Sequence, residues 1–212
     1  MTYSRPASAT SPRVLAIDPG SAQSGVVLYE PLSPEPVVYS GVLRNIDLVA
    51  ALRGRIIFGG EELTGPHVLA VEFPVAQGMP ASNELFVTVE WIGRFREAWG
   101  GEFVHVARPA VKLHLCGVAR AKDGNVRAAL IDRFGGESAL SKRRKCATCK
   151  GTGQFGQGRG SKRTTHDCHA CGKSGYLGED GPLYGVSSHA WPALAVAVTY
   201  IETTANAEGG RE

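Results

Sequence analysis

The fold of this chain is decided by Val14-Leu15-Ala16-Ile17-Asp18-Pro19-Gly20-Ser21, continued by Ala22-Gln23-Ser24-Gly25 and Val26-Val27-Leu28-Tyr29. An apolar run ends at one carboxylate, a Pro-Gly-Ser turn follows, and a second apolar run leads away, which predicts a β-hairpin at the start of a sheet. Asp18 is therefore expected at a strand end. Because an Asp in such a place commonly caps the backbone of a turn, any chemical role for it depends on what the rest of the chain supplies.

Further strands and helices follow in a regular order. Strands are expected at 37–43, 67–72 and 102–106, and helices at 47–56, 82–99, 109–116, 125–134 and 187–202. The strand at 67–72 is nearly all apolar, as in strands buried on both faces, and it ends in Glu72. A meander of strands followed by alternating helices and strands predicts an α/β fold, with a mixed five-stranded sheet flanked by helices on both faces.

Two of the expected helices carry local signals. Asp47 can cap the first helix, and Ser82 or Asn83 can cap the long second one. The buried side of the long helix is expected to contain Leu85, Phe86, Val89, Ile92, Gly93 and Phe95.

Length and composition favour a globular chain with one core and a small insertion. The chain has 212 residues, of which 43% are hydrophobic. It contains no apolar run of about 18 residues, and residues 1–11 form a short polar lead without the features of a secretory signal. We therefore expect no membrane span and a location in the cytoplasm.

One segment is strongly basic, although the net charge is only +3. Residues 141–163 lack acids and carry Lys142, Arg143, Arg144, Lys145, Lys150, Arg159, Lys162 and Arg163. Such an arm is expected to bind phosphates. A solvated loop kept soluble by its charge remains the alternative.

Four of the five cysteines form two Cys-x-x-Cys pairs, Cys146/Cys149 and Cys168/Cys171. In a chain without a secretory signal this spacing favours a metal over disulfides, and four thiolates suit Zn²⁺. Each pair precedes a glycine-rich tail, so the segment resembles the zinc-binding repeats of DnaJ-type chaperones. His166 and His169 are alternative ligands. Gly172-Lys173-Ser174 does not complete a phosphate-binding loop, because Asp167 stands where that loop needs glycine.

Three side chains are expected to converge at one edge of the sheet: Asp18, Glu72 and His189, the last near the start of the closing helix. Carboxylates and histidine can bind two Mg²⁺ ions, which together promote phosphodiester hydrolysis. Two turn carboxylates and a helix-capping His are the alternative.

Several motifs together resemble RuvC-type Holliday-junction resolvases of the ribonuclease H-like superfamily. Ile17-Asp18-Pro19-Gly20-Ser21 with Ser24-Gly25 resembles the first motif, and Ala70-Val71-Glu72 the second. Residues 109–112 and 121–127 resemble the stretch between the later strand and helix, and 188–197 the closing helix.

The resemblance implies a Mg²⁺-dependent (or Mn²⁺-dependent) endonuclease that acts as a homodimer on branched DNA. Asp18, Glu72 and His189 would be its catalytic metal ligands. The ribonuclease H-like core would span 12–137 and 183–206, and the zinc-stapled basic insertion 138–182. Phosphate contacts are expected from Lys112, Lys122, Arg127, Lys142, Arg143, Arg144 and Lys145, and contact with the junction centre from the loop at 76–80.

The chain departs from the family pattern at two places. Pro192 stands one helical turn after His189, where the family has an Asp, so that one ligand is missing unless Asp123 or Asp180 replaces it. The zinc segment is absent from typical members, which indicates a phage-type or otherwise divergent branch. If it is phage-encoded, we expect it to act in the cytoplasm of the bacterial host.

Other classes of function fit less of the sequence. A noncatalytic branched-DNA-binding or scaffolding protein with a decayed metal site remains open. An actin-like ATPase would need two duplicated lobes, for which the chain is too short, and a chaperone-type zinc module would not explain Asp18 and Glu72.

Overall fold

The computed structural model describes residues 13–54, 67–75, 80–157 and 164–209. The chain divides into two compact units, one made of Met1–Arg133 with Gly185–Glu212 and the other of Phe134–Tyr184. Within the described residues, the helices lack the length and apolar character that a membrane span requires.

The first unit is built on a mixed five-stranded sheet, as the sequence predicts. Its strands are β1 (Arg13–Asp18), β2 (Gln23–Tyr29), β3 (Val37–Arg44), β4 (His67–Phe73) and β5 (Phe103–Ala107), in the order β3-β2-β1-β4-β5. The predicted hairpin is antiparallel, with Asp18 opposite Gly25. β4 pairs in parallel with both β1 and β5. The parallel pairing of β1 and β4 thus places the C-terminal ends of these two strands side by side.

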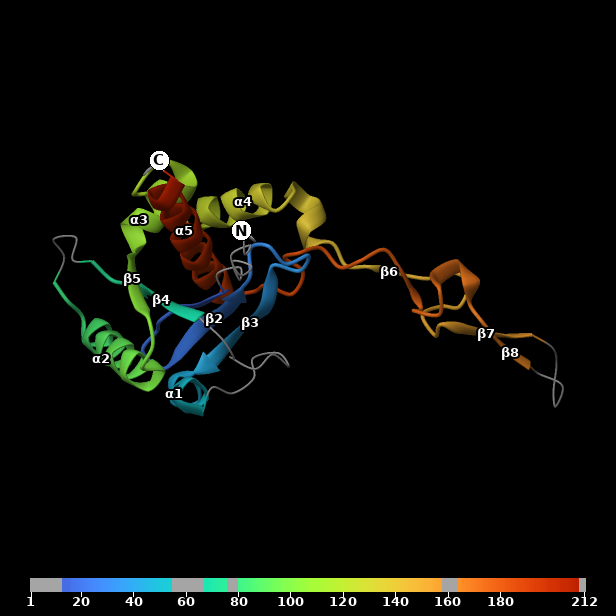
Figure 1. The fold of residues 1–212 in the computed structure, drawn as a ribbon, viewed down its shortest axis with the longest axis horizontal. Coiled ribbons are helices and arrows are strands. Elements are labelled where there is room, and N and C mark those ends of the chain that lie inside the picture. Colours follow the sequence, from blue (N-terminus) through green and yellow to red (C-terminus); the bar gives the residue numbers. More distant parts are fainter. Residues whose placement is uncertain (1–12, 55–66, 76–79, 158–163, 210–212) are drawn as a thin grey trace, which may run out of the picture. The chain divides into compact units, whose positions relative to one another are not determined.

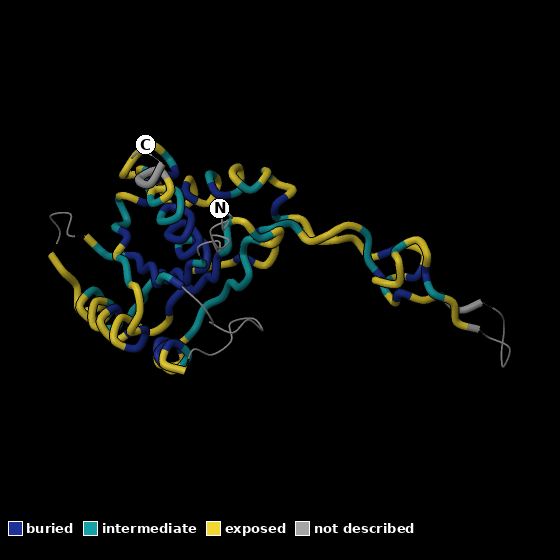
Figure 2. The backbone as a smooth tube through the Cα atoms, viewed as in Figure 1, coloured by how far each residue is buried: buried dark blue, intermediate teal, exposed yellow. Residues whose placement is uncertain are grey.

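Helices cover both faces of this sheet (Figure 1). α1 (Asn45–Gly54) and α2 (Asn83–Trp99) lie on one face, and α3 (Arg108–Cys116), α4 (Asp123–Arg133) and α5 (Ala190–Gly209) on the other. Alternate residues of β1 and β4, such as Leu15 and Val71, enter the core beneath α1 and α2. The dark blue segments in Figure 2 show this burial along the strands and α5.

Glu202 of α5 links this helix to α3 and α4 on the same face of the sheet. Its carboxylate accepts hydrogen bonds from Arg133 Nε of α4, at 2.9 Å, and lies 2.6 Å from His114 Nε2 of α3. This cluster fixes the helices that supply much of the candidate site described below.

Only the second half of α2 is buried as predicted. Ser82 caps the helix, with its side chain accepting a hydrogen bond from Leu85 N. Ile92 and Phe95 are buried, but Phe86 is 63% exposed and Val89 40% exposed. The expectation for these two residues was wrong, because the helix packs against α1 and β4 through its C-terminal half, where Ala98 and Trp99 are also buried. The expectation for Gly93 was wrong as well, because it is exposed beside the buried Ile92.

α1 and α5 begin at other residues than the sequence predicts. α1 starts at Asn45, so Asp47 lies within its first turn and pairs with Arg44 instead of capping the helix; Ile56 lies outside the described residues. α5 starts at Ala190, because Ser188 has a positive φ of 47° that interrupts a right-handed helix. His189 therefore precedes the helix.

The second unit consists of short elements. A turn of 3-10 helix, η1 (Gly136–Leu140), leads into β6 (Arg144–Lys145), which pairs with β9 (Tyr176–Leu177). β7 (Gln154–Gln157) pairs with β8 (Thr164–Asp167), and η3 (His169–Cys171) follows.

Candidate functional site

Asp18 and Glu72 lie side by side at the ends of two parallel strands. Ile17 pairs with Val71, so each carboxylate is one residue beyond a matched pair and both point to the same face. That face is the one covered by α5, because the neighbours Ile17 and Val71 point into the opposite core. Asp18 is 8% exposed and Glu72 6% exposed.

His189, the residue directly before α5, contacts the Asp18 carboxylate. Its Nδ1 lies 3.3 Å from Asp18 Oδ2. A side chain at Gly25, opposite Asp18 on β2, would place Cβ only 2.0 Å from the carbonyl oxygen of His189. The glycine is therefore what allows the start of α5 to approach the hairpin and His189 to face Asp18.

The loop after Asp18 is held by a buried amide. Ser24 Oγ donates to Asn45 Oδ1 at 2.7 Å, and Asn45 Nδ2 donates to the carbonyl of Gly20 at 2.9 Å. The backbone of Asn45 also donates to Ala22 O at 3.0 Å. Because Ser24 and Asn45 are both fully buried, these bonds fix the turn that presents Asp18.

Arg108 links Glu72 to a further carboxylate. Its Nη1 donates to Glu72 Oε1 and its Nη2 to Asp123 Oδ2, both at 2.9 Å. Lys112 Nζ lies 3.0 Å from Asp123 Oδ1. α3 thus brings a guanidinium and an ammonium to the site, and α4 brings a carboxylate.

Burial makes the two strand-end carboxylates hard to ionise. It raises the pKa of Glu72 to about 7, a shift that Arg108 opposes and the neighbouring Asp18 reinforces. Burial also raises the pKa of Asp18, against the favourable effect of His189. Poorly solvated carboxylates of this kind are suitable ligands for a hard divalent cation such as Mg²⁺.

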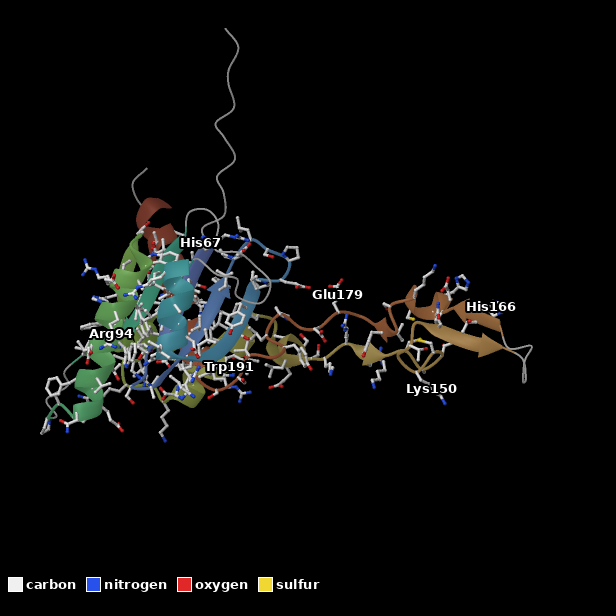
Figure 3. All side chains as sticks on the ribbon, turned by 90° about the horizontal axis from the view of Figure 1, so that it is seen from below. His67, Arg94, Lys150, His166, Glu179 and Trp191 are labelled. Carbon is white, nitrogen blue, oxygen red and sulfur yellow. The ribbon has the colours of Figure 1, made fainter. Side chains whose placement is uncertain are left out.

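Next to Asp18, Glu72 and His189 border a pocket of about 350 Å³. Its charged side is formed by Glu72, Arg108, Lys112, Asp123 and His189, and its apolar side includes Val111, Val126, Trp191 and Pro192. The guanidinium of Arg127 stacks over the Trp191 ring at 5.0 Å, and Figure 3 labels this tryptophan within the first unit. A pocket with one charged and one apolar wall can take a phosphate with its attached nucleoside.

The four cysteines of the second unit form a cluster that fits Zn²⁺. Their sulfur atoms all lie within 4.8 Å of one another, and the Cys146–Cys168 and Cys149–Cys171 sulfur distances are both 3.7 Å. Thiolates bound tetrahedrally to one Zn²⁺ at about 2.3 Å lie about 3.8 Å apart. Figure 3 shows these sulfur atoms, in yellow, gathered near Lys150.

The cysteine segment is an internal repeat in structure as well as in sequence. Cys146 N donates to Gly175 O and Cys168 N to Gly153 O, both at 2.9 Å. A Cβ at Gly153 would lie 2.1 Å from the carbonyl oxygen of Lys173. The two halves therefore hold each other's backbone at positions that admit only glycine.

Among the described residues, only the cysteine group has three or more His, Cys, Asp or Glu donors gathered closely enough to hold an ion as they stand. His166 and His169 are not part of it. At the edge of the sheet, Arg108 occupies the space between Glu72 and Asp123.

The predicted phosphate-binding residues differ in their surroundings. Lys122 is exposed, as are Arg127 and the run from Lys142 to Lys145, whereas Lys112 is ion-paired with Asp123. Arg143 N donates to Asp180 Oδ1 at 2.8 Å, so Asp180 is engaged within the second unit. Of the predicted loop at 76–80, only Pro80 lies among the described residues.

Two residues of the site are missing from the sequence prediction, Arg108 and Asn45. Arg108 directly follows β5, which adjoins β4, so knowledge of the strand order would have pointed to it. No local signal distinguishes Asn45, because its partners belong to a loop more than 20 residues earlier.

The sheet order and the flanking helices define a ribonuclease H-like fold. Among solved structures, the chain is similar to RuvC of T. thermophilus in complex with a Holliday-junction substrate, with 16% identity, coverage of 89% of this chain and 92% of that chain, and a TM-score of 0.53. A second structure, of Thermus thermophilus RuvC, is 18% identical over 89% of this chain and 93% of that chain, with a TM-score of 0.47. The sequence matches no described protein family and no curated protein.

Proposed function

We propose that this chain is a divalent-metal-dependent endonuclease that cleaves branched DNA. The observation that supports this proposal most directly is the pair of buried carboxylates, Asp18 and Glu72, at the ends of neighbouring parallel strands, with His189 against Asp18. The similar RuvC structure holds a Holliday junction, and this makes a four-way junction the first substrate to test.

Asp18, Glu72 and His189 are the proposed ligands of Mg²⁺ or Mn²⁺. A divalent ion bound there supplies the Lewis acidity that activates a water molecule and stabilises the departing oxygen in phosphodiester hydrolysis. The donor set fits such an ion, because the buried Glu72 carboxylate and the His189 imidazole border one pocket, and the buried Asp18 carboxylate lies next to both.

The other side chains of the pocket have distinct tasks. Contact with His189 orients the Asp18 carboxylate, and the buried bonds of Asn45 keep the Asp18 loop rigid. Lys112 and Arg108 attract the phosphate to the charged wall. The apolar wall at Val126 and Trp191 excludes water from the sugar and base beside it.

The basic residues serve DNA binding through phosphates, without reading sequence. Lys122 lies exposed directly before α4 and Arg127 lies exposed on it. Arg144 and Lys145 form a strand directly before the first proposed zinc ligand. Zn²⁺ on the four cysteines would stabilise that basic segment. A homodimer in a bacterial cytoplasm, with phage origin, remains part of this proposal.

Cleavage of a synthetic four-way junction tests the function. The wild-type chain with Mg²⁺ should nick the junction and leave a linear duplex of the same sequence intact. Asp18→Asn should bind the junction with similar affinity and cut it at least about 100-fold more slowly. Equal cleavage by both proteins, or cleavage of the duplex alone, would contradict the proposal.

A noncatalytic branched-DNA-binding protein is the second candidate, because Pro192 cannot ligate a metal and Arg108 already pairs with Glu72. The same experiment separates the two. Tight, salt-sensitive junction binding without any cleavage that depends on Asp18 would favour the binding protein.

A further inference from the structure

The position of Arg108 is the most informative feature of the pocket beyond the proposed ligands. The guanidinium forms one hydrogen bond to Glu72 and one to Asp123, through two different nitrogens, each at 2.9 Å. Its side chain is 41% exposed and borders the pocket. A planar guanidinium in this arrangement behaves as a fixed cation that bridges two carboxylates, as a bound metal ion does.

The opposite wall of the pocket lacks a carboxylate. Pro192 lies in the first turn of α5 after His189 and borders the pocket together with Arg108 and Asp123. α5 thus has no carboxylate at Pro192. α4 contributes Asp123 to the pocket instead, and this carboxylate is paired with Arg108 and Lys112. The Arg108 guanidinium therefore occupies the carboxylates that a second metal ion would need as ligands.

The cationic side chains of the pocket disfavour a second metal ion. Arg108 pairs with both Glu72 and Asp123, and Lys112 pairs with Asp123 as well. A second divalent cation would have to bind close to these two cations, which repel it.

We propose that Arg108 is the second cation of this site: one divalent ion binds at Asp18 and Glu72, and the guanidinium, held between Glu72 and Asp123, stabilises the charge of the scissile phosphate. The assignment rests on the proposed nuclease function. Arginine suits the task because it stays protonated and its remaining N–H groups can bind two phosphate oxygens.

Counting Mn²⁺ ions provides a test that does not depend on activity. Calorimetric titration of the zinc-loaded chain, with electron paramagnetic resonance of the bound ion, should show one magnetically isolated Mn²⁺ per chain that is lost in Asp18→Asn. Two Mn²⁺ ions about 4 Å apart would instead couple magnetically. Two coupled ions in the wild-type chain would overturn the assignment.

Removing the guanidinium at Arg108, alone or together with a new carboxylate at position 192, provides a second test. Arg108→Ala should keep one Mn²⁺ and slow cleavage about 100-fold, as expected for loss of a transition-state cation. Arg108→Ala combined with Pro192→Asp should bind two coupled ions and regain cleavage at high Mg²⁺. Arg94→Ala, which removes an exposed ion pair on α2, is the matched control and should change neither readout.

Further outcomes separate this inference from the proposed function. If Arg108→Ala is unstable, Arg108→Lys should retain one ion and cleave more slowly than wild type, because an ammonium cannot make the same forked contact. Cleavage by Arg108→Ala or Arg108→Lys at the wild-type rate would refute the role of the guanidinium. Ion counts as predicted in a chain that cuts no branched DNA would refute the proposed function, and with it the role of Arg108 at a scissile phosphate, and would retain only the single divalent ion at Asp18 and Glu72.

Discussion

Replacing Glu72 by Gln should stabilise the metal-free protein at alkaline pH, although it removes a charge from an ion pair with Arg108. Glu72 is 6% exposed, and burial raises its pKa from 4.5 to about 7 despite the guanidinium at 2.9 Å. The folded state therefore prefers the protonated, neutral carboxyl group. Gln resembles that neutral form in shape and polarity, so it avoids the cost of burying the charge.

The pKa shift sets the size and sign of this effect. Below about pH 4.5 the carboxyl is protonated in both the folded and the unfolded chain, so its contribution to folding is fully present. As the pH rises to about 7, the unfolded chain releases this proton and the folded chain retains it, which lowers the free energy of unfolding by about 1.4 kcal/mol per pH unit. Above about pH 7 the loss is complete, at about 3 kcal/mol.

Urea denaturation in Mg²⁺-free buffer that leaves zinc bound provides the measurement. Glu72→Gln should exceed the wild type in stability by up to about 3 kcal/mol near pH 8.5, and by much less near pH 4.5. Glu90→Gln, which removes an exposed pair with Arg94 on α2, should change stability by less than about 0.5 kcal/mol at either pH. A destabilised Glu72→Gln protein near pH 8.5, or a difference that does not vary with pH, would refute the reasoning.

Mg²⁺ should remove most of the difference in stability between the two proteins. The ion binds the ionised carboxylate of the folded chain and stabilises the wild type by about 2.7 kcal/mol at 100 times its dissociation constant. Glu72→Gln should gain much less stability, because an amide is a poorer ligand for this ion. Equal stabilisation of both proteins by Mg²⁺ would place the ion away from Glu72.

Three other changes test the residues that support the Asp18 loop and the cysteine cluster of the second unit. Gly25→Ala should cost about 1–3 kcal/mol in urea unfolding and weaken Mn²⁺ binding in calorimetry, because the added Cβ would meet the His189 carbonyl at 2.0 Å; unchanged binding would contradict this. Asn45→Ala should cost about 2–4 kcal/mol in the same unfolding assay, since the hydroxyl of Ser24 and a backbone carbonyl lose their buried partner. Cys168→Ser should lower the zinc content measured by mass spectrometry and expose the segment Phe134–Tyr184 to protease, while the first unit keeps its melting transition.

The sheet could be predicted from sequence because its signals are local. The apolar runs before Asp18 and Glu72 define two strands, and the Pro-Gly-Ser turn defines the hairpin. The resemblance to known motifs then supplied the pairing that brings the two carboxylates together. The bounds of α3 also follow from local signals, Pro109 in its first turn and Gly117, with φ of 70°, after its last.

The missed features depend on contacts between distant segments. Phe86 and Val89 have the helical spacing of a buried face, but burial also requires an element to pack against. The start of α5 could not be read from the sequence, because Ser188 adopts a left-handed conformation that serine rarely takes. Arg108 is an ordinary surface residue in sequence and becomes part of the site only through the β4–β5 pairing.

The two walls of the pocket differ in how strongly the fold constrains them. Register between β1 and β4 fixes Asp18 beside Glu72, so moving either carboxylate would shift a buried strand. The helical wall carries no such constraint: Pro192 lies in the first turn of α5, where backbone N–H groups have no partner within the helix, so proline costs no hydrogen bond there. Loss of a ligand at this position therefore leaves the fold intact, and α3 and α4 can supply Arg108 and Asp123 to the same pocket. Under the proposed function, a site of this design would keep its carboxylate pair and use a side chain, Arg108, in place of a second metal ion.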